Sequence, residues 1–291
     1  MNASFFLFAA ALLTCSWSHG QANQQKNLEK LIAAENGFAA MAESASFKKA
    51  FLQNLDSTGI VFNKAEPVNG ISFYIKLPDN NELLFKWYPA YAELPGNGDM
   101  GFTTGPYIII SNKNKDTIAG GKFFSIWHKN KKGVFKVLLD GGVNDSNQHS
   151  FAFGKIRPAT AAGQSAAGIS AGKSKPFAEC EKEFTELAGN NLLKAYEKYM
   201  AKQSYFLRAD MATGLNKTAN LETLKKTSFT SCNFDKKDTR NAADNTLCFN
   251  YGTAKIVNHQ SGKDQKGYFV QIWQCQQEGW KIIADVLQLI N

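Results

Sequence analysis

The chain carries two separate helical patterns of apolar residues, one at the start of each half. In the first, apolar residues recur every three or four positions and share one helix face: Leu28, Leu31, Ile32, Phe38, Ala42 and Ala45. The second has the same spacing and comprises Phe177, Cys180, Phe184, Leu187 and Ala188. Both patterns predict amphipathic helices that pack on a core through one face.

Patterns typical of β-strands close each half of the chain. They cover residues 101–111, 121–128 and 135–140, and then 247–257, 267–275 and 280–289. Short polar segments at 129–133 and 276–279 predict hairpin turns. In the middle of the halves, residues 71–77 are β-like by composition, whereas 221–226 are helical. Helices followed by runs of strands predict an α+β fold.

The two halves match each other in order, which indicates a tandem duplication. Glu35 corresponds to Glu181, and Trp127 to Trp273, both at an offset of 146 residues. Two further blocks match at nearly the same offset, 102–105 with 249–252 and 133–140 with 279–285.

A segment of different composition separates the copies. Residues 159–172 hold nine Ala or Gly in 14 positions and no charge, which is typical of a flexible linker. The sequence therefore predicts a first domain over 23–144, a linker over 145–174 and a second domain over 175–291.

This organisation resembles the SnoaL-like and ketosteroid-isomerase-like proteins of the nuclear transport factor 2 superfamily. The residues that carry the resemblance lie at 98–107, 121–127 and 133–140. It implies two tandem cone-shaped α+β barrel repeats, each a curved antiparallel sheet wrapped around N-terminal helices, with a pocket open at one end. It also implies a helix over residues 70–77, against their β-like composition. Cones of this type often dimerise, so we expect the copies to pack as an intramolecular pseudo-dimer.

Glu35 is the most suggestive candidate for chemistry, because a carboxyl in an apolar stripe can have a raised pKa and act as a general base. Glu181 occupies the matching place in the second copy. The alternative is that each Glu reaches the cone rim or pairs with a Lys or Arg. Asp140 and Asp285 recur at the end of the last predicted strand, where they could close the pocket mouth or cap a turn.

Aromatic residues could line a pocket for a flat ligand, or simply form the core. The candidates in the two copies are Trp87, Tyr91, Tyr107 and Trp127, then Tyr251 and Trp273. We expect a protein that binds a small apolar or aromatic molecule and does not catalyse a reaction. The alternatives are an isomerase, dehydratase or cyclase that uses a pocket carboxylate, and a non-catalytic interaction module of the cell envelope.

Several other classes of site find no support in the sequence. Residues 96–101 match G-x-G-x-x-G, but a proline precedes them and a strand follows, so they predict a turn and not a nucleotide site. The histidines lack metal-ligand spacing, so no metal and no cofactor is expected. The net charge of +8 comes largely from lysine, whereas nucleic-acid sites interleave arginine with aromatics, so no nucleic-acid partner is expected.

The N-terminus predicts export. Residues 1–22 contain no Lys, Arg, Asp or Glu, and the apolar run 5–13 has the length of a signal-peptide core. We expect cleavage before Gln21 and a periplasmic or secreted protein. A lipid anchor at Cys15 is the alternative. The apolar run is too short to span a bilayer, so no transmembrane segment is expected.

Four cysteines remain downstream, Cys180, Cys232, Cys248 and Cys275, an even number that permits disulfides in an exported chain. If a hairpin is centred near Arg240, Cys232 and Cys248 face each other across it, within disulfide reach. The alternative is that all four are buried thiols.

Overall fold

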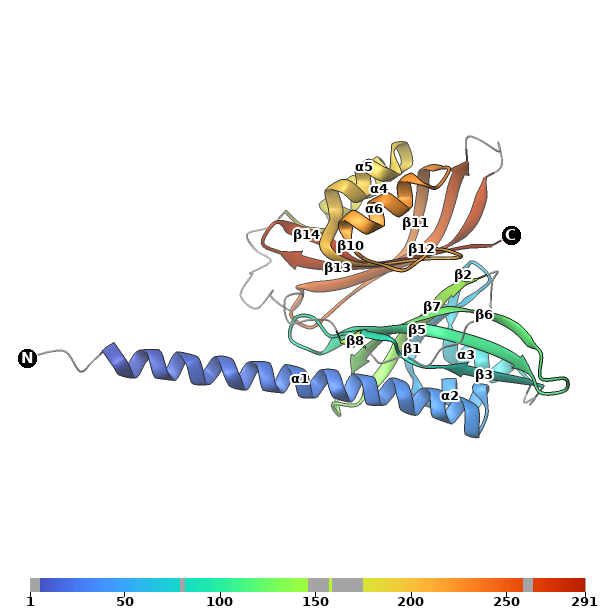
Figure 1. Ribbon diagram of the computed structural model, residues 1–291, viewed down its shortest axis with the longest axis horizontal. Coiled ribbons are helices and arrows are strands. Elements are labelled where there is room, and N and C mark those ends of the chain that lie inside the picture. The colour runs from blue at the N-terminus through green and yellow to red at the C-terminus, as the bar shows by residue number, and fades with distance from the viewer. Residues whose placement is uncertain (1–5, 79–81, 146–156, 159–174, 259–263, 291) are drawn as a thin grey trace, which may run out of the picture.

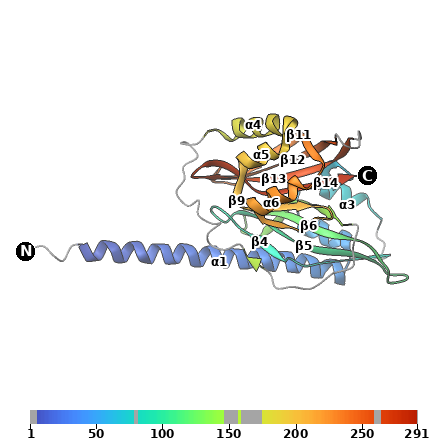
Figure 2. The same cartoon turned by 45° about the horizontal axis from the view of Figure 1, so that its top comes forward.

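The structure of the protein, a computed structural model, describes residues 6–78, 82–145, 157–158, 175–258 and 264–290. Two sheets lie in layers, and the helices of each repeat cover the face of its sheet that points away from the other repeat (Figure 1). The same layers are seen from another side in Figure 2. The predicted α+β fold with two repeats is confirmed.

Repeat one has three helices, α1 (Phe6–Ser44), α2 (Phe47–Asn54) and α3 (Gly70–Lys76). Its strands are β1 (Leu55–Asn63), β2 (Glu66–Asn69), β3 (Leu83–Trp87), β4 (Tyr91–Glu93), β5 (Met100–Ser111), β6 (Thr117–Lys129), β7 (Phe135–Asn144) and β8 (Arg157–Pro158). The helix that the resemblance implied over 70–77 is therefore present, and the β-like composition of that segment was misleading.

Repeat two also has three helices, α4 (Phe177–Asn190), α5 (Leu192–Tyr199) and α6 (Lys217–Lys225). Its strands are β9 (Met200–Arg208), β10 (Gly214–Asn216), β11 (Phe229–Asn241), β12 (Leu247–Asn258), β13 (Gln265–Gln276) and β14 (Gly279–Ile290).

Local signals begin the short helices at matching places. The side chains of Ser46, Asn69, Asn191 and Asn216 each accept a hydrogen bond from a backbone N–H of the helix that follows. Such capping satisfies a donor that the first helical turn leaves unpaired. The G-x-G-x-x-G segment forms the turn between β4 and β5, as predicted.

The sheets are mixed and not purely antiparallel, which corrects the expectation. In repeat one the order is β2-β1-β7-β6-β5-β4-β8 with β3 beside β5, and in repeat two it is β10-β9-β14-β13-β12-β11. β1 runs parallel to β7, and β9 runs parallel to β14. The first strand after α2 or α5 pairs with a strand near the end of its repeat, β7 or β14, and the long intervening chain permits the parallel pairing.

One apolar cluster joins the two sheets, and we call it the interface core. It combines buried side chains of both repeats: Met100, Phe102, Phe124, Ile126, Leu139, Val143, Tyr205, Leu207, Phe249, Tyr251, Val270, Ile272 and Val286. Hydrogen bonds flank it: the Arg240 guanidinium donates to the Thr58 carbonyl at 2.9 Å, and the backbone N–H of Asn144 donates to the Gln288 amide oxygen at 2.7 Å. The repeats therefore share a packed, largely apolar contact.

The predicted disulfide is wrong. Cys232 lies opposite Ile256 and Cys248 lies opposite Asn241, because β11 continues to Asn241 and the hairpin turns beyond it. Cys180, Cys232 and Cys248 are buried free thiols, and Cys275 is also buried.

Most of the predicted linker lies outside the described residues. The exceptions are Asp145 and β8, and β8 pairs parallel with β4 through Tyr91–Arg157 and Ala92–Pro158. This part of the segment is thus tied to repeat one. The proposed domain boundaries themselves stay predictions.

α1 runs out beyond both sheets toward the N-terminus (Figure 1). Its C-terminal part packs on repeat one through Leu28, Leu31 and Phe38, which are almost fully buried. Among the described residues, no helix combines the length and apolar character that crossing a bilayer requires.

Candidate functional site

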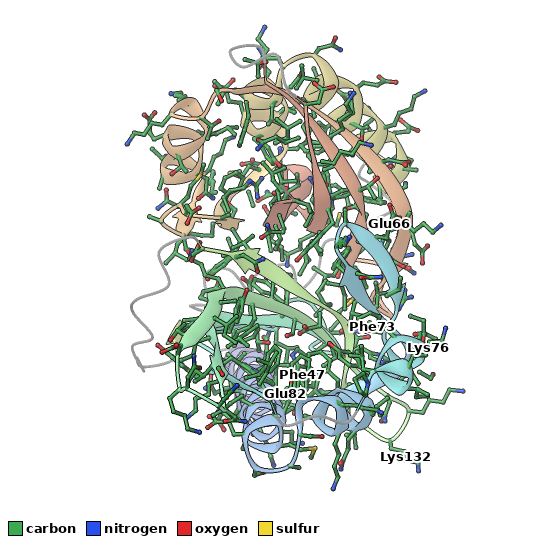
Figure 3. The ribbon with its side chains drawn as sticks, turned by 90° about the vertical axis from the view of Figure 1, so that its right-hand side faces the viewer. Phe47, Glu66, Phe73, Lys76, Glu82 and Lys132 are labelled. Carbon is green, nitrogen blue, oxygen red and sulfur yellow. The ribbon has the colours of Figure 1, made fainter. Side chains whose placement is uncertain are left out.

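A cavity of about 290 Å³ lies inside repeat one, between its helices and the curved sheet. Aromatic side chains form most of its wall, chiefly Phe47, Phe51, Phe62, Tyr74, Phe85, Trp87, Tyr107 and Phe123. Phe47 lies among the side chains of repeat one, whereas Lys76 and Lys132 lie at the edge (Figure 3). A cavity with such walls favours a flat apolar ligand.

Asp140 is the acidic residue among those that line this cavity. It lies within β7, opposite Ser125 of β6, and not at the strand end that the sequence suggested. The Ser125 hydroxyl donates to Asp140 Oδ2 at 2.7 Å, and no described residue holds Oδ1. Burial raises the pKa of Asp140 to about 8, with a smaller contribution from the nearby Glu35 carboxylate and an opposing one from Ser125. At neutral pH this carboxyl is therefore mostly protonated and can donate a hydrogen bond.

Glu35 is fully buried behind the cavity wall and does not line the cavity. Its Oε1 accepts from Trp87 Nε1 at 2.7 Å, and its Oε2 accepts from the Thr103 hydroxyl at 2.6 Å and from Trp127 Nε1 at 3.0 Å. Burial raises the pKa of Glu35, although these three donors oppose the rise. Glu35 therefore has a positioning role: its hydrogen bond holds the Trp87 indole, whose ring lines the cavity.

One wall of the cavity comes from repeat two. The Tyr268 ring, on β13, stacks on Phe62 with ring centroids 3.7 Å apart and planes inclined by 6°. Its hydroxyl donates to the Gly142 carbonyl at 2.6 Å and accepts from the Gly142 N–H at 3.0 Å. Gly142 has φ of 152°, a conformation that favours glycine. The cavity of repeat one is therefore complete only when repeat two is docked.

Asp285, the counterpart of Asp140, has quite different surroundings. It is 1% exposed and forms a salt bridge of 2.5 Å with Arg208. Its Oδ2 accepts from the Tyr196 hydroxyl at 2.9 Å and from Gln271 Nε2 at 2.8 Å. The charge is compensated and the lone pairs are used, so this carboxyl is structural.

Glu181, the counterpart of Glu35, pairs with Lys236 at 2.7 Å, which is the alternative considered for it. It does not reach the matching tryptophan: Trp273 is fully buried and, within the described residues, its Nε1 has no hydrogen-bond partner. The wall-organising network of repeat one is thus absent from repeat two.

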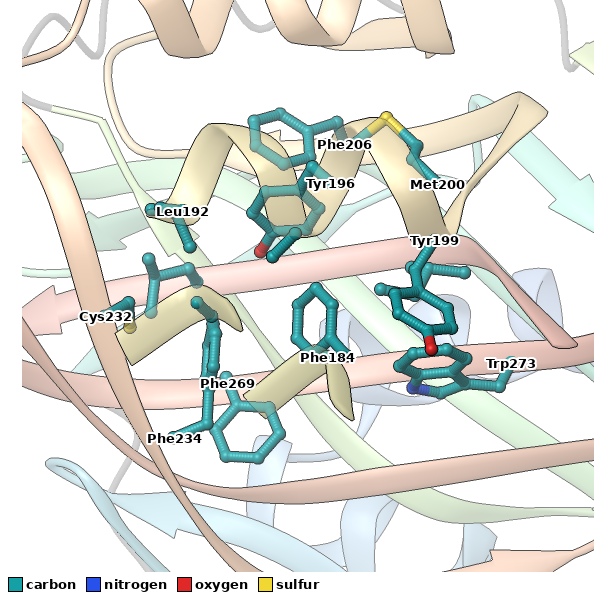
Figure 4. Packing of buried hydrophobic residues seen from close by; sticks show 14 of the residues in the cluster. Phe184, Leu192, Tyr196, Tyr199, Met200, Phe206, Cys232, Phe234, Phe269 and Trp273 are labelled. Atoms are coloured by element: carbon teal, nitrogen blue, oxygen red, sulfur yellow. The ribbon is translucent and has the colours of Figure 1, made fainter. Parts of the chain in front are cut away.

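The interior of repeat two is packed with its own side chains. Phe184 lies between Tyr196, Tyr199 and Trp273 (Figure 4), with ring centroids 5.4, 6.1 and 5.4 Å away. The place that the cavity occupies in repeat one is filled here by aromatic rings.

The remaining candidates divide between the cavity and the interface core. Trp87 and Tyr107 line the cavity, and Trp127 lies behind it. Tyr251 belongs to the interface core, and Tyr91 packs against it. Tyr268 was missed, because nothing in the sequence shows which strand of one copy reaches the pocket of the other. Within the described part of the chain, no cluster of His, Cys, Asp or Glu could hold a metal ion.

The architecture of both repeats agrees with the fold that the resemblance implied. In both repeats two helices precede a curved, mainly antiparallel sheet that closes around them, and a third helix follows the first strands. Each repeat has the nuclear transport factor 2-like fold.

Comparison with protein-family models gives no match, and no curated protein matches either. Solved structures of single nuclear transport factor 2-like proteins are similar to a segment of about one repeat. One from Rhodospirillum rubrum, of unknown function in nutrient uptake, has 20% identity and a TM-score of 0.34 over 40% of this chain and all of its own. One from Cytophaga hutchinsonii has 16% identity and a TM-score of 0.32, over 39% and 94%.

A scytalone dehydratase-like protein from Novosphingobium aromaticivorans has 12% identity and a TM-score of 0.33, over 39% of this chain and 81% of its own. Similarities at this level carry no information about the function of this protein.

Proposed function

We propose that this protein binds a small, flat, mainly apolar molecule in repeat one, and that the ligand carries one hydrogen-bond acceptor such as a ketone oxygen. The observation that carries the proposal is the aromatic cavity with Asp140 in its wall. A volume of about 290 Å³ is at the small end of ligand pockets, so a ligand of one to three fused rings fits best.

Asp140 supplies the polar contact in this proposal. A carboxyl with a pKa of about 8 is protonated at neutral pH, and its Oδ1 has no partner among the described residues. A protonated carboxyl in an apolar site donates a hydrogen bond to a carbonyl oxygen. A ligand with an acceptor at that point gains this bond, whereas a ligand that is entirely apolar leaves the carboxyl unpaired, at a cost.

In this proposal repeat two is the structural half of an intramolecular pseudo-dimer. Its packed interior and the closed Arg208–Asp285 pair make a rigid sheet. That sheet covers the apolar outer face of repeat one and brings Tyr268 to the cavity.

The test uses 2-acetonaphthone as the probe and 2-ethylnaphthalene as its matched control without oxygen. Binding is followed by quenching of tryptophan fluorescence, because Trp87 lines the cavity. We expect the ketone to bind more tightly than the hydrocarbon below pH 7, and its advantage to disappear as the pH rises through 8, where Asp140 loses its proton. Asp140→Leu should remove the advantage at every pH.

Two results would contradict the proposal. One is binding of neither probe. The other is equal binding of both probes at pH 6, which would mean that Asp140 contacts no ligand acceptor.

A second candidate, an isomerase, dehydratase or cyclase, is favoured by the same pKa. A group with a pKa near the working pH is well suited to accept and return a proton. The base in that case is Asp140 and not Glu35, which does not reach the cavity. Exchange of the methyl protons of 2-acetonaphthone in D₂O tests it by NMR. Catalysed exchange that Asp140→Asn abolishes supports an enzyme, and exchange at the rate of buffer alone excludes it for this ketone.

Export to the periplasm or the medium remains part of the proposal, with a lipid anchor at Cys15 as the alternative. Cleavage before Gln21 would shorten α1 but leave every buried contact from Leu28 onward in place. Mass spectrometry of the protein purified from its host distinguishes the cases. A chain that begins at Gln21 supports cleavage, a lipid-modified chain that begins at Cys15 supports the anchor, and a chain that begins at Met1 contradicts both.

A further inference from the structure

A second cavity, of about 280 Å³, lies where the edge of repeat one meets repeat two. We call it the junction cavity. Glu93, at the end of β4, comes from repeat one. The rest of the lining comes from β9, α6, β13, β14 and the turn between the last two strands. Unlike the aromatic cavity, it has no aromatic side chain among the described residues that line it.

The lining of the junction cavity is rich in amides and lysines. The amides are Gln203, Gln274, Gln276 and Gln277, and the cations are Lys202, Lys217 and Lys281. Lys202 is paired with Glu278 at 3.3 Å, on the exposed rim. Burial lowers the pKa of Lys281, Glu278 opposes this, and the neighbouring Lys217 and Lys198 cations add smaller lowering effects. Each ammonium already donates to a backbone carbonyl at the end of α5, Lys217 to Glu197 and Lys281 to Lys198. Each keeps further N–H donors, and an anion between the two would relieve their mutual repulsion.

Two buried polar groups in the junction cavity have hydrogen-bonding capacity left. Gln274 is 1% exposed, and its Nε2 has no partner among the described residues, although its Oε1 accepts from Gln276. Glu93 is 7% exposed, and among the described residues its side chain accepts only from the Tyr91 hydroxyl, at 2.8 Å. Buried polar groups normally have their hydrogen bonds satisfied, so a donor and a carboxyl left open at one place point to a ligand.

The arrangement also narrows the class of ligand. Three lysines disfavour an ammonium group, and the absence of an aromatic platform disfavours a flat ring. Burial raises the pKa of Glu93 to about 7, so above that pH its carboxylate would repel a dianion such as phosphate. Hydroxyl groups can donate to this carboxylate and also accept from amides. A single carboxylate satisfies the lysines without adding a second charge.

We propose that the junction cavity binds a small hydroxylated carboxylate of the sugar-acid type, with its carboxylate between Lys217 and Lys281 and its hydroxyls on Glu93 and the glutamine amides. The site needs both repeats, because Glu93 belongs to the first and the lysines to the second. It is independent of the aromatic cavity.

The experiment is titration calorimetry of the full chain with sodium D-glucuronate as the probe. Three controls are used. D-Glucose has the hydroxyls without the negative charge, D-glucosamine carries a positive charge instead, and acetate has the carboxylate without the hydroxyls. We expect glucuronate to bind more tightly than all three. The variant Lys217→Gln/Lys281→Gln should weaken glucuronate binding at least tenfold, because each charged hydrogen bond is worth about that factor.

A matched variant with the same charge change, Lys131→Gln/Lys132→Gln in an exposed turn, should leave the affinity unchanged. Glu93→Gln should stay within about threefold, since the amide keeps an acceptor, whereas Glu93→Leu should lose about tenfold. Thermal unfolding of each variant checks that it is folded. The proposal is overturned if glucuronate does not bind, if acetate or glucose binds as tightly, or if both lysine pairs have the same effect.

Discussion

Asp140→Asn is the substitution with the most distinctive expected outcome, because it makes the stability of the protein less sensitive to pH. Asparagine has nearly the shape of aspartate and can still accept from the Ser125 hydroxyl, but it cannot ionise. An acid whose pKa is higher in the folded than in the unfolded chain binds more protons when the protein is folded. The free energy of unfolding therefore falls as the pH rises from the pKa in the unfolded chain to the pKa in the folded chain. For Asp140 this interval runs from 3.8 to about 8.

The size of the effect follows from the same interval. Each pH unit within it lowers the free energy of unfolding by about 1.4 kcal/mol. Between pH 5 and pH 7 the wild-type protein should therefore lose ~3 kcal/mol more than Asp140→Asn. Burial raises the pKa of Glu93 to about 7, so both proteins lose stability over this range through Glu93, and the raised pKa of Glu35 acts in the same direction in both. The difference between them isolates Asp140.

The assay is urea unfolding of both proteins at pH 5, 6, 7 and 8, followed by tryptophan fluorescence. Asp116→Asn, at an exposed turn, serves as the control and should parallel the wild type. A wild-type minus Asp140→Asn difference that stays constant from pH 5 to pH 8 would refute the reasoning, because it would show that Asp140 is ionised throughout.

Four other substitutions test the asymmetry of the repeats. Glu35→Ala should lower the free energy of unfolding by ~3–5 kcal/mol because it leaves the buried Trp87 N–H and Thr103 hydroxyl unpaired, while Trp127 keeps its bond to Thr103. Glu181→Ala should cost about 1 kcal/mol or less because its lysine partner is partly exposed. Equal costs in urea unfolding would contradict this. Arg208→Met should cost ~3–5 kcal/mol because Asp285 stays buried without its cation, and no loss would contradict a structural pair. Tyr268→Ala should weaken 2-acetonaphthone binding about tenfold but keep its pH dependence, and unchanged affinity would contradict a wall from repeat two.

The order of elements could be predicted from the sequence because local patterns determine it. The duplication, the opening helices and the terminal strands all follow from spacing and offset. What failed depends on register and long-range pairing. The hairpin after β11 turns beyond Asn241, and no local signal distinguishes that turn from one centred near Arg240, so Cys232 and Cys248 were placed together wrongly. The parallel pairing of β1 with β7 is a tertiary contact of the same kind.

The candidate site was predicted in part for the same reason. The sequence placed Glu35 in an apolar stripe and Asp140 at the end of a strand, but it could not say which one faces a cavity. That depends on the side of the sheet and on the space left by neighbours. Glu35 is held by Trp87 and two other donors behind the wall, whereas Asp140 lies on the wall itself. The contribution of Tyr268 follows only from the docking of the repeats.

Matched positions explain why one repeat kept a cavity and the other filled it. β1 and β9 occupy equivalent places, since Leu55 and Ile60 pair with β7 as Met200 and Tyr205 pair with β14, at an offset of 145. At this offset Phe51, Val61, Asn63 and Asp140 of repeat one correspond to Tyr196, Phe206, Arg208 and Asp285 of repeat two.

These residue differences between the repeats change the surroundings of one matched carboxyl, Asp140 in repeat one and Asp285 in repeat two. Phe206 adds volume where Val61 leaves space, and its ring lies 3.7 Å from the guanidinium of Arg208. Arg208 can be buried only because Asp285 neutralises it, and Tyr196 adds a hydroxyl where repeat one has a bare ring. Together they turn an open, protonated acid into a closed ion pair. The same change that removes a binding site from repeat two makes its sheet a firm support for the one that repeat one retains.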